Sequence, residues 1–329
     1  MKFGPLALDH AQGAILAHSL TLDDGVLRKG RVLGVEDVAR LKAAGIQTVT
    51  AAKLEPDDIA EDSAAATIGG HLTAPGLRLG TVFTGRVNLI ADAAGIIRID
   101  ASAIAAHNAV DEGLTIATVP DLMRIETDQL VATVKVIPYA LPQTVVGNGA
   151  TALGKMPIQL HPFQGGAAHL VMTRTPGFKE SLLTKGEAVV RARVEALGYD
   201  LKVTTVAHEE AAIADVLTPA DLTLILGASA TSDRADVAPA AVVAAGGQID
   251  RFGMPVDPGN LLFFGRLEGK PVVGLPGCAR SPVLNGVDWV LERLAAGLPV
   301  TSADIAAMGV GGLLKEMSGR PQPRRPEKP

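Results

Sequence analysis

The feature that most constrains the fold is a regular alternation of short apolar runs and helix-like segments over residues 161–312. The apolar runs predict strands at 167–173, 202–206, 221–226, 261–267 and 271–275, the last two forming a hairpin. Apolar residues at helical spacing predict helices at 186–197, 209–217, 236–245 and 282–296. This alternation favours an α/β domain with three layers, α/β/α, around a mostly parallel sheet.

The first 160 residues follow a different pattern. Acidic first turns predict helices at 36–44 and 56–66, and a strand is expected at 46–51. Residues 81–139 are β-rich, with strands predicted at 114–119 and 130–137, and 144–155 is predicted to be a loop or linker. We therefore expect a mixed α+β, β-rich region at 1–160, the α/β domain at 161–312 and a disordered proline-rich tail at 313–329.

Composition excludes several classes of function. The chain has 47% hydrophobic and 20% charged residues, which is typical of a globular protein, and a formal net charge of −5. Nucleic acids and anionic membranes require a basic surface, and only 3% of residues are aromatic, too few for base stacking. The apolar runs are too short to span a membrane, no secretory signal opens the chain, and one cysteine fits a reducing compartment. We expect a cytoplasmic protein without nucleic-acid or membrane partners.

The first loop that can carry chemistry is GASATSDRAD, at 227–236, between a buried strand and a helix. In α/β sheets ligands bind beyond the carboxyl ends of the strands. Small residues let a ligand approach the backbone, hydroxyls form hydrogen bonds, acids suit a metal ion or a proton, and arginine suits a phosphate. The candidate residues are Gly227, Ala228, Ser229, Thr231, Ser232, Asp233, Arg234 and Asp236. The alternative is that Ser232 or Asp233 only caps the helix, with Pro239 in its first turn.

The second loop is PGCARSP, at 276–282, which follows the strand PVVGL. Ser281 is predicted at a helix N-cap with Pro282 as the first helical residue, and Arg280 can meet an anion there. The candidate binding residues are Pro276, Gly277, Cys278, Arg280 and Ser281.

Other chemistries have weaker support. A thiol near a helix N-terminus, as at Cys278, can act as a nucleophile, but no histidine stands near it in sequence, which favours a small loop residue. The seven histidines lack zinc-type spacing, and DPGN at 257–260 is an ordinary turn signal. The chain contains no dinucleotide-binding glycine motif, no P-loop and no G-x-S-x-G elbow.

Together the loops resemble the molybdopterin-binding domain shared by molybdopterin adenylyltransferase and molybdopterin molybdotransferase, two enzymes of molybdenum-cofactor assembly. The resemblance rests on ILGASATSDRADVAPAAVVAAGG, where Asp236, Val237 and Pro239 match a D-V-x-P step, and on FGRLEGKPVVGLPGCARSP. It covers about residues 165–312. Residues 1–160 resemble the leading region of bacterial proteins that carry this domain, some of which continue into a domain that cytidylates the cofactor.

The resemblance implies a binding site for the pterin and its terminal phosphate across both loops. The residues implied are Gly227, Ser229, Thr231, Ser232, Gly277 and Ser281. It also implies that Asp236 holds Mg²⁺ or orients a reacting phosphate, which suits phosphoryl transfer. The implied partners are molybdopterin or its nucleotide form and a cofactor-accepting or cytidylyltransferase protein, and the implied assembly is a homo-oligomer.

Three departures from the family pattern favour binding over catalysis. The usual T-G-G-x-S/T-x-G is GASATSD, residues 173–177 lack the acidic pair of the usual G-D-E-L, and the usual K-P-G is Asp257-Pro258-Gly259. An acid in place of a base weakens the attraction of a phosphate. Three functions therefore stay open: Mg²⁺-dependent nucleotidyl or molybdate transfer, a non-catalytic cofactor carrier or regulator, and a hydrolase of pyridine-nucleotide derivatives.

Overall fold

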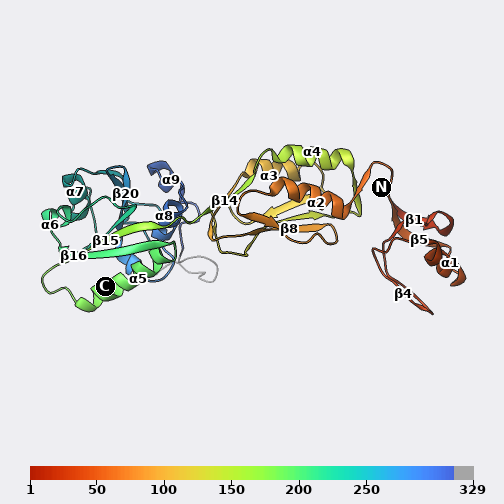
Figure 1. Ribbon diagram of the computed structural model, residues 1–329, viewed down its shortest axis with the longest axis horizontal. Coiled ribbons are helices and arrows are strands. Elements are labelled where there is room, and N and C mark those ends of the chain that lie inside the picture. Colours follow the sequence, from red (N-terminus) through yellow and green to blue (C-terminus); the bar gives the residue numbers. More distant parts are fainter. Residues whose placement is uncertain (315–329) are drawn as a thin grey trace, which may run out of the picture. The chain divides into compact units, whose positions relative to one another are not determined.

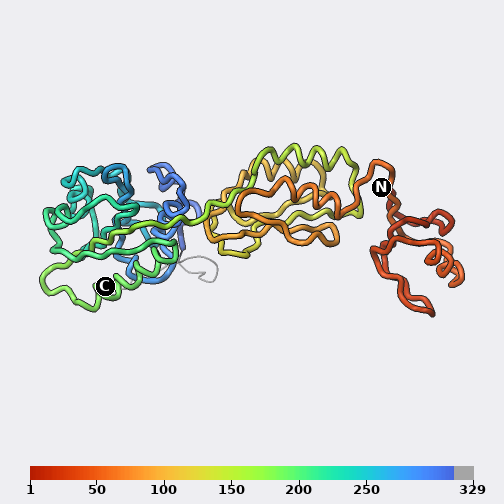
Figure 2. The backbone as a smooth tube through the Cα atoms, in the orientation of Figure 1, coloured from red at the N-terminus to blue at the C-terminus, as the bar shows by residue number. Residues whose placement is uncertain are grey.

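A computed structural model describes residues 1–314, and the chain divides into two compact units that meet between Leu160 and His161. Figure 2 traces the first unit from red to yellow-green and the second from green to blue. No helix within residues 1–314 is long and apolar enough to cross a membrane. The tail expected at 313–329 lies outside the described residues except for its first two, of which Leu314 donates its N–H to the carbonyl of Asp257 at 2.9 Å.

The first 53 residues of the first unit form a small β structure with its own core. Strand β5 lies between β1 and β2 in an antiparallel sheet, and β3 and β4 form a hairpin. Leu16, Leu27 and Leu41 are fully buried in the core beneath them. The elements are β1 Lys2–Ala7, the 3₁₀ helix η1 Leu8–His10, β2 Ile15–Leu16, β3 Leu20–Leu22, β4 Gly25–Leu27, α1 Val35–Ala43 and β5 Thr48–Lys53.

The rest of the first unit has a second core, between helix α2 and an antiparallel sheet of order β10-β12-β8-β7 (Figure 1). Two smaller sheets, β11-β9-β14 and β13-β6, complete it. The elements are β6 Asp58–Ala60, α2 Glu61–Leu72, β7 Leu77–Leu79, β8 Arg86–Ala91, β9 Gly95–Ile99, α3 Ala101–Asn108, β10 Leu114–Thr118, β11 Arg124–Ile125, β12 Leu130–Val136, β13 Ala140–Pro142, α4 Gln143–Leu153 and β14 Ile158–Pro162.

Two predictions for the first unit are wrong. The segment expected to be a loop at 144–155 is helix α4, which buries Val146, Gly149 and Leu153 at helical spacing. Its two glycines and lack of charge conceal that pattern, because glycine lowers helix propensity. The helix expected at 56–66 begins only at Glu61, because residues 58–60 pair with β13 as a strand.

The second unit is built on a mixed six-stranded sheet of order β16-β15-β17-β20-β19-β18. The pairings of β15 with β16, β15 with β17 and β17 with β20 are parallel, whereas both pairings of β19 are antiparallel. The elements are β15 Gly166–Arg174, α5 Glu180–Glu195, β16 Tyr199–Ala207, α6 Glu210–Ala214, β17 Leu222–Leu226, α7 Val237–Ala244, β18 Gln248–Phe252, β19 Phe263–Leu267, β20 Lys270–Leu275, the 3₁₀ helix η2 Gly277–Arg280, α8 Gly286–Ala295 and α9 Ser302–Ala307. The α/β class is confirmed, with β19 running against the other strands.

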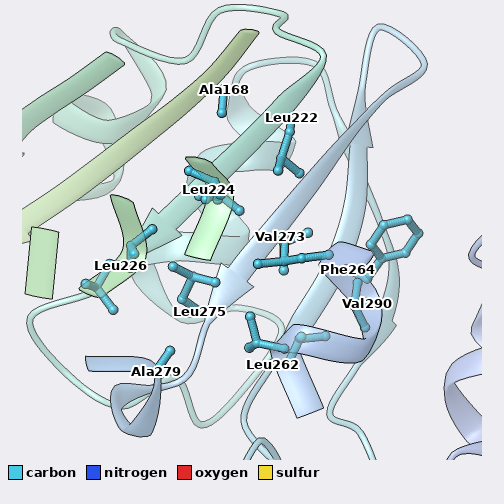
Figure 3. Packing of buried hydrophobic residues seen from close by; sticks show 14 of the residues in the cluster. Ala168, Leu222, Leu224, Leu226, Leu262, Phe264, Val273, Leu275, Ala279 and Val290 are labelled. Atoms are coloured by element: carbon cyan, nitrogen blue, oxygen red, sulfur yellow. The ribbon is translucent and has the colours of Figure 1, made fainter. Parts of the chain in front are cut away.

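Helices cover both faces of this sheet. On one face, residues such as Leu224 and Val273 pack against α5 and α8 (Figure 3). On the other, Val171 and Ile225 pack against α6 and α7. Alternate residues of each strand point to opposite faces, which is why strands buried on both sides appear as continuous apolar runs. The loops at the strand ends are thereby held on a rigid frame.

The start of helix α8 differs from the prediction. Ser281 ends η2, and α8 begins at Gly286, with Asn285 as its N-cap and Asp288 completing a capping box. Asn285 and Asp288 supply the two reciprocal side-chain bonds that define this motif, so the Ser-Pro signal four residues earlier was misleading. Strand β18, at the edge of the sheet, was not predicted.

Candidate functional site

Four loops lie at one edge of the sheet of the second unit. Strands β15, β16, β17 and β20 run in parallel, so the loops that follow them leave from the same edge. The chain passes from β15 outward to β16 and then crosses to β17 on the other side of β15. The strand order therefore reverses between β15 and β17, and open α/β sheets bind ligands beyond the carboxyl ends of their strands at such a point.

A buried hydroxyl joins three of these loops. The Thr173 Oγ1 accepts the Ala228 N–H at 2.7 Å and is hydrogen-bonded to the Nδ1 of His208 at 2.8 Å. The His208 N–H donates to the carbonyl of Arg174 at 2.9 Å. Thr173 is fully buried at the end of β15, so its hydroxyl fixes where the loop after β17 begins. Sequence reasoning missed both Thr173 and His208.

Replacing Thr173 by valine is expected to lower the free energy of unfolding by about 1–3 kcal/mol, because the Ala228 N–H loses its acceptor. Amide hydrogen exchange at Ala228 should accelerate in the same variant. Thr173→Ser keeps the hydroxyl and should retain slow exchange at Ala228. Equal exchange rates in the valine and serine variants would show that this hydroxyl does not hold the loop.

Arg280 connects the second predicted loop to the first. Its Nη2 donates to the carbonyl of Gly227 at 2.7 Å, and its guanidinium lies 6.0 Å from the centre of the Phe178 ring. Its Nε is buried and has no hydrogen-bond partner among residues 1–314. Burial lowers the pKa of the guanidinium from its ordinary value, yet an arginine in a protein stays protonated. A positive charge with spare hydrogen-bonding capacity therefore lies between the two loops.

Two cavities open at this edge. One, of about 270 Å³, is lined by Gly277, Cys278, Arg280 and Ser281, all predicted site residues. The other, of about 450 Å³, follows β15 and β16 and is lined by residues that include His208. Residues of the second predicted loop thus line one cavity. The other cavity was not predicted from the sequence.

The loop at 227–236 is shaped by Asp236. Its Oδ1 accepts the Val237 N–H at 2.8 Å and its Oδ2 accepts the Ser232 N–H at 2.9 Å. Asp236, and neither Ser232 nor Asp233, is therefore the N-cap of α7. Within residues 1–314 no three His, Cys, Asp or Glu side chains are grouped so as to hold a metal ion. The role of Asp236 toward Mg²⁺ stays a prediction.

The other polar residues of this loop divide into two groups. Arg234 donates to the carbonyl of Ile249 at 2.8 Å and so fastens the loop to β18, and Asp233 accepts the Ala235 N–H at 2.8 Å. The side-chain hydroxyls of three residues make no hydrogen bond within the described part of the chain; these are Ser229, Thr231 and Ser232. These three hydroxyls are available to a ligand.

Within residues 1–314, the Cys278 thiol is hydrogen-bonded to a side-chain amide and to no histidine. The buried Asn285 donates from Nδ2 to the Cys278 Sγ at 3.1 Å and accepts the Val287 N–H at 3.1 Å. Asn285 thus joins the exposed thiol to the start of α8. The arrangement gives Cys278 a hydrogen-bond donor and a fixed position without a general base, which agrees with its reading as a small loop residue.

An arginine on α5 donates hydrogen bonds to backbone carbonyls of the second loop and of the segment that follows it. Arg193 donates to the carbonyls of Ala279 and Ser281, each at 2.6 Å, and to that of Val283 at 3.0 Å. Its Nε donates to Asp288 Oδ1 at 2.7 Å in an ion pair whose side chains are 10% and 13% exposed. Arg193 therefore fixes both η2 and the first turn of α8, although nothing in its own sequence surroundings indicates it.

Comparisons with known proteins give limited matches. Residues 5–53 match a domain of unknown function (DUF8806). No curated protein matches the sequence. Among solved structures, the chain is similar to the molybdopterin biosynthesis MoeA protein from Pyrococcus horikosii, at 13% sequence identity and a TM-score of 0.31, over 90% of this chain and 75% of that one.

Proposed function

We propose that residues 161–312 bind molybdopterin or its nucleotide form at the carboxyl edge of the six-stranded sheet, as part of molybdenum-cofactor biosynthesis. The observation that carries the proposal is the position of Arg280. Its guanidinium is anchored to Gly227 of one loop while it lines the cavity of the other. Phosphates are bound by such charge-assisted, planar donors, and the two loops are those that resemble the molybdopterin-binding domain.

The remaining loop residues supply what a polar, phosphorylated pterin needs. The hydroxyls of Ser229, Thr231 and Ser232 make no hydrogen bond within residues 1–314, and Gly277 is exposed at the cavity wall. Hydroxyls can donate to ring nitrogens or phosphate oxygens and also accept from ring N–H groups. We assign Arg280 to the phosphate and the hydroxyls of the 227–236 loop to the polar edges of the ligand.

Binding without group transfer is the form of this function that the residues support best. Both carboxylate oxygens of Asp236 already accept backbone N–H bonds, and residues 1–314 contain no group of three His, Cys, Asp or Glu side chains that could hold a metal ion. Mg²⁺ at such a place is held largely by ligand phosphates and water. We therefore propose a carrier that passes the cofactor to an accepting or cytidylyltransferase protein, with Mg²⁺-dependent transfer as the second candidate.

The test is a calorimetric titration of the full chain with molybdopterin and with its adenylated form, each with and without Mg²⁺. We expect saturable binding with an affinity that Mg²⁺ leaves within about threefold. Nucleotide turnover that requires Mg²⁺ would replace the carrier by a transferase. Absence of binding to either form would contradict the proposal. A separate titration with a pyridine nucleotide tests the hydrolase alternative, which its turnover would support.

A further inference from the structure

The first unit contains a cavity of its own, of about 560 Å³, which is within the range of small-molecule sites, about 300–1,000 Å³. It belongs to a different unit from the loops discussed above, so it stands independently of the pterin site. Its wall includes charged residues of both signs and exposed apolar residues. The residues used below are Phe3, Lys29, Glu61, Lys135, Ile137 and Tyr139.

Glu61 is the negative group of this cavity. It begins helix α2, donates its N–H to the carbonyl of Tyr139 at 2.9 Å, and places Oε2 so close to Gly85 that a Cβ there would lie 2.6 Å away. Its carboxylate accepts no hydrogen bond from any residue in 1–314. Burial raises the pKa of Glu61, and its charge adds to burial in raising the pKa of Tyr139. A partly buried carboxylate without a hydrogen-bond donor gains most from a cationic ligand group.

Two ammonium groups stand near Glu61 without pairing to it. Both Lys135 and Lys29 lower the pKa of the Glu61 carboxyl, though by less than burial raises it. Lys135 donates to the carbonyl of Thr84, which leaves two of its three N–H groups. The Lys29 ammonium donates to no acceptor within residues 1–314. Within residues 1–314 the cavity thus presents ammonium N–H groups and a carboxylate that keep hydrogen-bonding capacity for a ligand.

Apolar side chains form the rest of the wall. Phe3 is 59% exposed and Ile137 is 63% exposed, although both are large hydrophobic residues. Both line the same cavity as Glu61 and the lysines. Exposed apolar surface beside convergent polar groups is typical of a ligand site, because the apolar part of the ligand covers it.

We propose that this cavity binds a small zwitterion with an apolar side chain, such as an α-amino acid. Lys29 and Lys135 bind its carboxylate, and Glu61 accepts hydrogen bonds from its ammonium group. Its side chain lies against Phe3 and Ile137. Each charge of the ligand lies beside an opposite charge of the cavity wall, and a zwitterion adds no net charge to the cavity.

The experiment is calorimetry on the full chain with three probes: L-phenylalanine, which carries both charges, phenylacetate, which carries only a carboxylate on a chain one carbon shorter, and phenethylamine, which carries only the ammonium group. L-Leucine is a fourth probe with a different side chain. We expect saturable binding of at least one of the two amino acids, about tenfold tighter than either singly charged probe. Failure of both amino acids to bind would overturn the proposal.

Three variants test which side chain binds the carboxylate of the ligand and which binds its ammonium group. Glu61→Gln should weaken amino-acid binding about tenfold and leave phenylacetate equal or tighter, whereas Lys29→Gln and Lys135→Gln should weaken amino acids and phenylacetate but not phenethylamine. Lys155→Gln removes an exposed lysine of the same unit outside the cavity and should change nothing. Equal losses for all three probes in every variant, or the same loss in Lys155→Gln, would overturn the assignment. Thermal unfolding of each variant shows whether the unit is intact.

Discussion

Arg193→Met is expected to lower the free energy of unfolding of the second unit by about 3–5 kcal/mol, the range for breaking one side of a buried ion pair. The variant leaves Asp288 without its cation and three loop carbonyls, those of Ala279, Ser281 and Val283, without their donor. Methionine fills similar space, so the effect is due to the lost bonds and not to a cavity. Urea unfolding followed by circular dichroism measures it.

Arg191→Met is the matched control, because it lies two residues away on the same helix. Its guanidinium pairs with Glu187 and Glu195 at the i−4 and i+4 positions in a setting that is about one-third exposed, and it donates to the carbonyl of Leu201 at 3.3 Å. Exposed pairs of this kind contribute roughly 0.3–0.5 kcal/mol each and a hydrogen bond about 0.5–1.5 kcal/mol, so the control should lose about 1–2 kcal/mol. Similar losses in the two variants would show that Arg193 does not hold the loop.

A second substitution tests whether the unpaired charge of Asp288 causes the loss of stability in Arg193→Met. Adding Asp288→Asn removes the unpaired charge. The asparagine keeps an oxygen that can accept the Asn285 N–H, which in the unmodified protein donates to Asp288 at 2.8 Å. The double variant should therefore recover part of the lost stability. If it is less stable than Arg193→Met alone, the buried charge is not the source of the loss.

The α/β class of the second unit could be predicted because its strands are buried on both faces. Residues 222–226 are all buried. A run of five apolar or β-branched residues between turn signals is typical of a strand that is covered on both faces. The edge strand β18 and the start of α8 could not be predicted the same way. β18 is only half-buried, and the cap of α8 is a buried asparagine that also binds Cys278 Sγ, which no local pattern shows.

The sequence predicts which loops form the candidate site, but it does not predict the side-chain contacts that hold them. Strand–loop–helix order alone places 227–236 and 276–282 at one edge of the sheet, and the structure joins Arg280 to Gly227 there. The groups that hold these loops come from far along the chain: Thr173 is 55 residues from Ala228, and Arg193 is 95 residues from Asp288. Such pairs follow from register and packing, which one sequence does not display.

Arg280→Met is expected to weaken molybdopterin binding by about 10- to 100-fold, the range for losing a charge-assisted hydrogen bond to phosphate, about 1.5–3 kcal/mol. Methionine retains an apolar stem beside Gly186, whose Cβ would lie 3.4 Å from the Arg280 Cγ. The change also removes one bond to the Gly227 carbonyl. Relief of a half-buried charge offsets that loss, so the free energy of unfolding should change by about 1 kcal/mol or less.

Arg251→Met is the control for this prediction, because Arg251 also donates to a backbone carbonyl, that of Gly253 at 2.9 Å. Arg251 lies outside both loops and outside the cavity lined by Arg280, so the affinity of this variant should stay within about threefold of that of the unmodified protein. Arg280→Lys separates charge from geometry. Lysine keeps the charge but lacks the planar fork, so we expect an intermediate affinity. Unchanged affinity in Arg280→Met, with binding intact in the parent chain, would place the phosphate elsewhere on this edge, and the cavity beside His208 would be the next site to test.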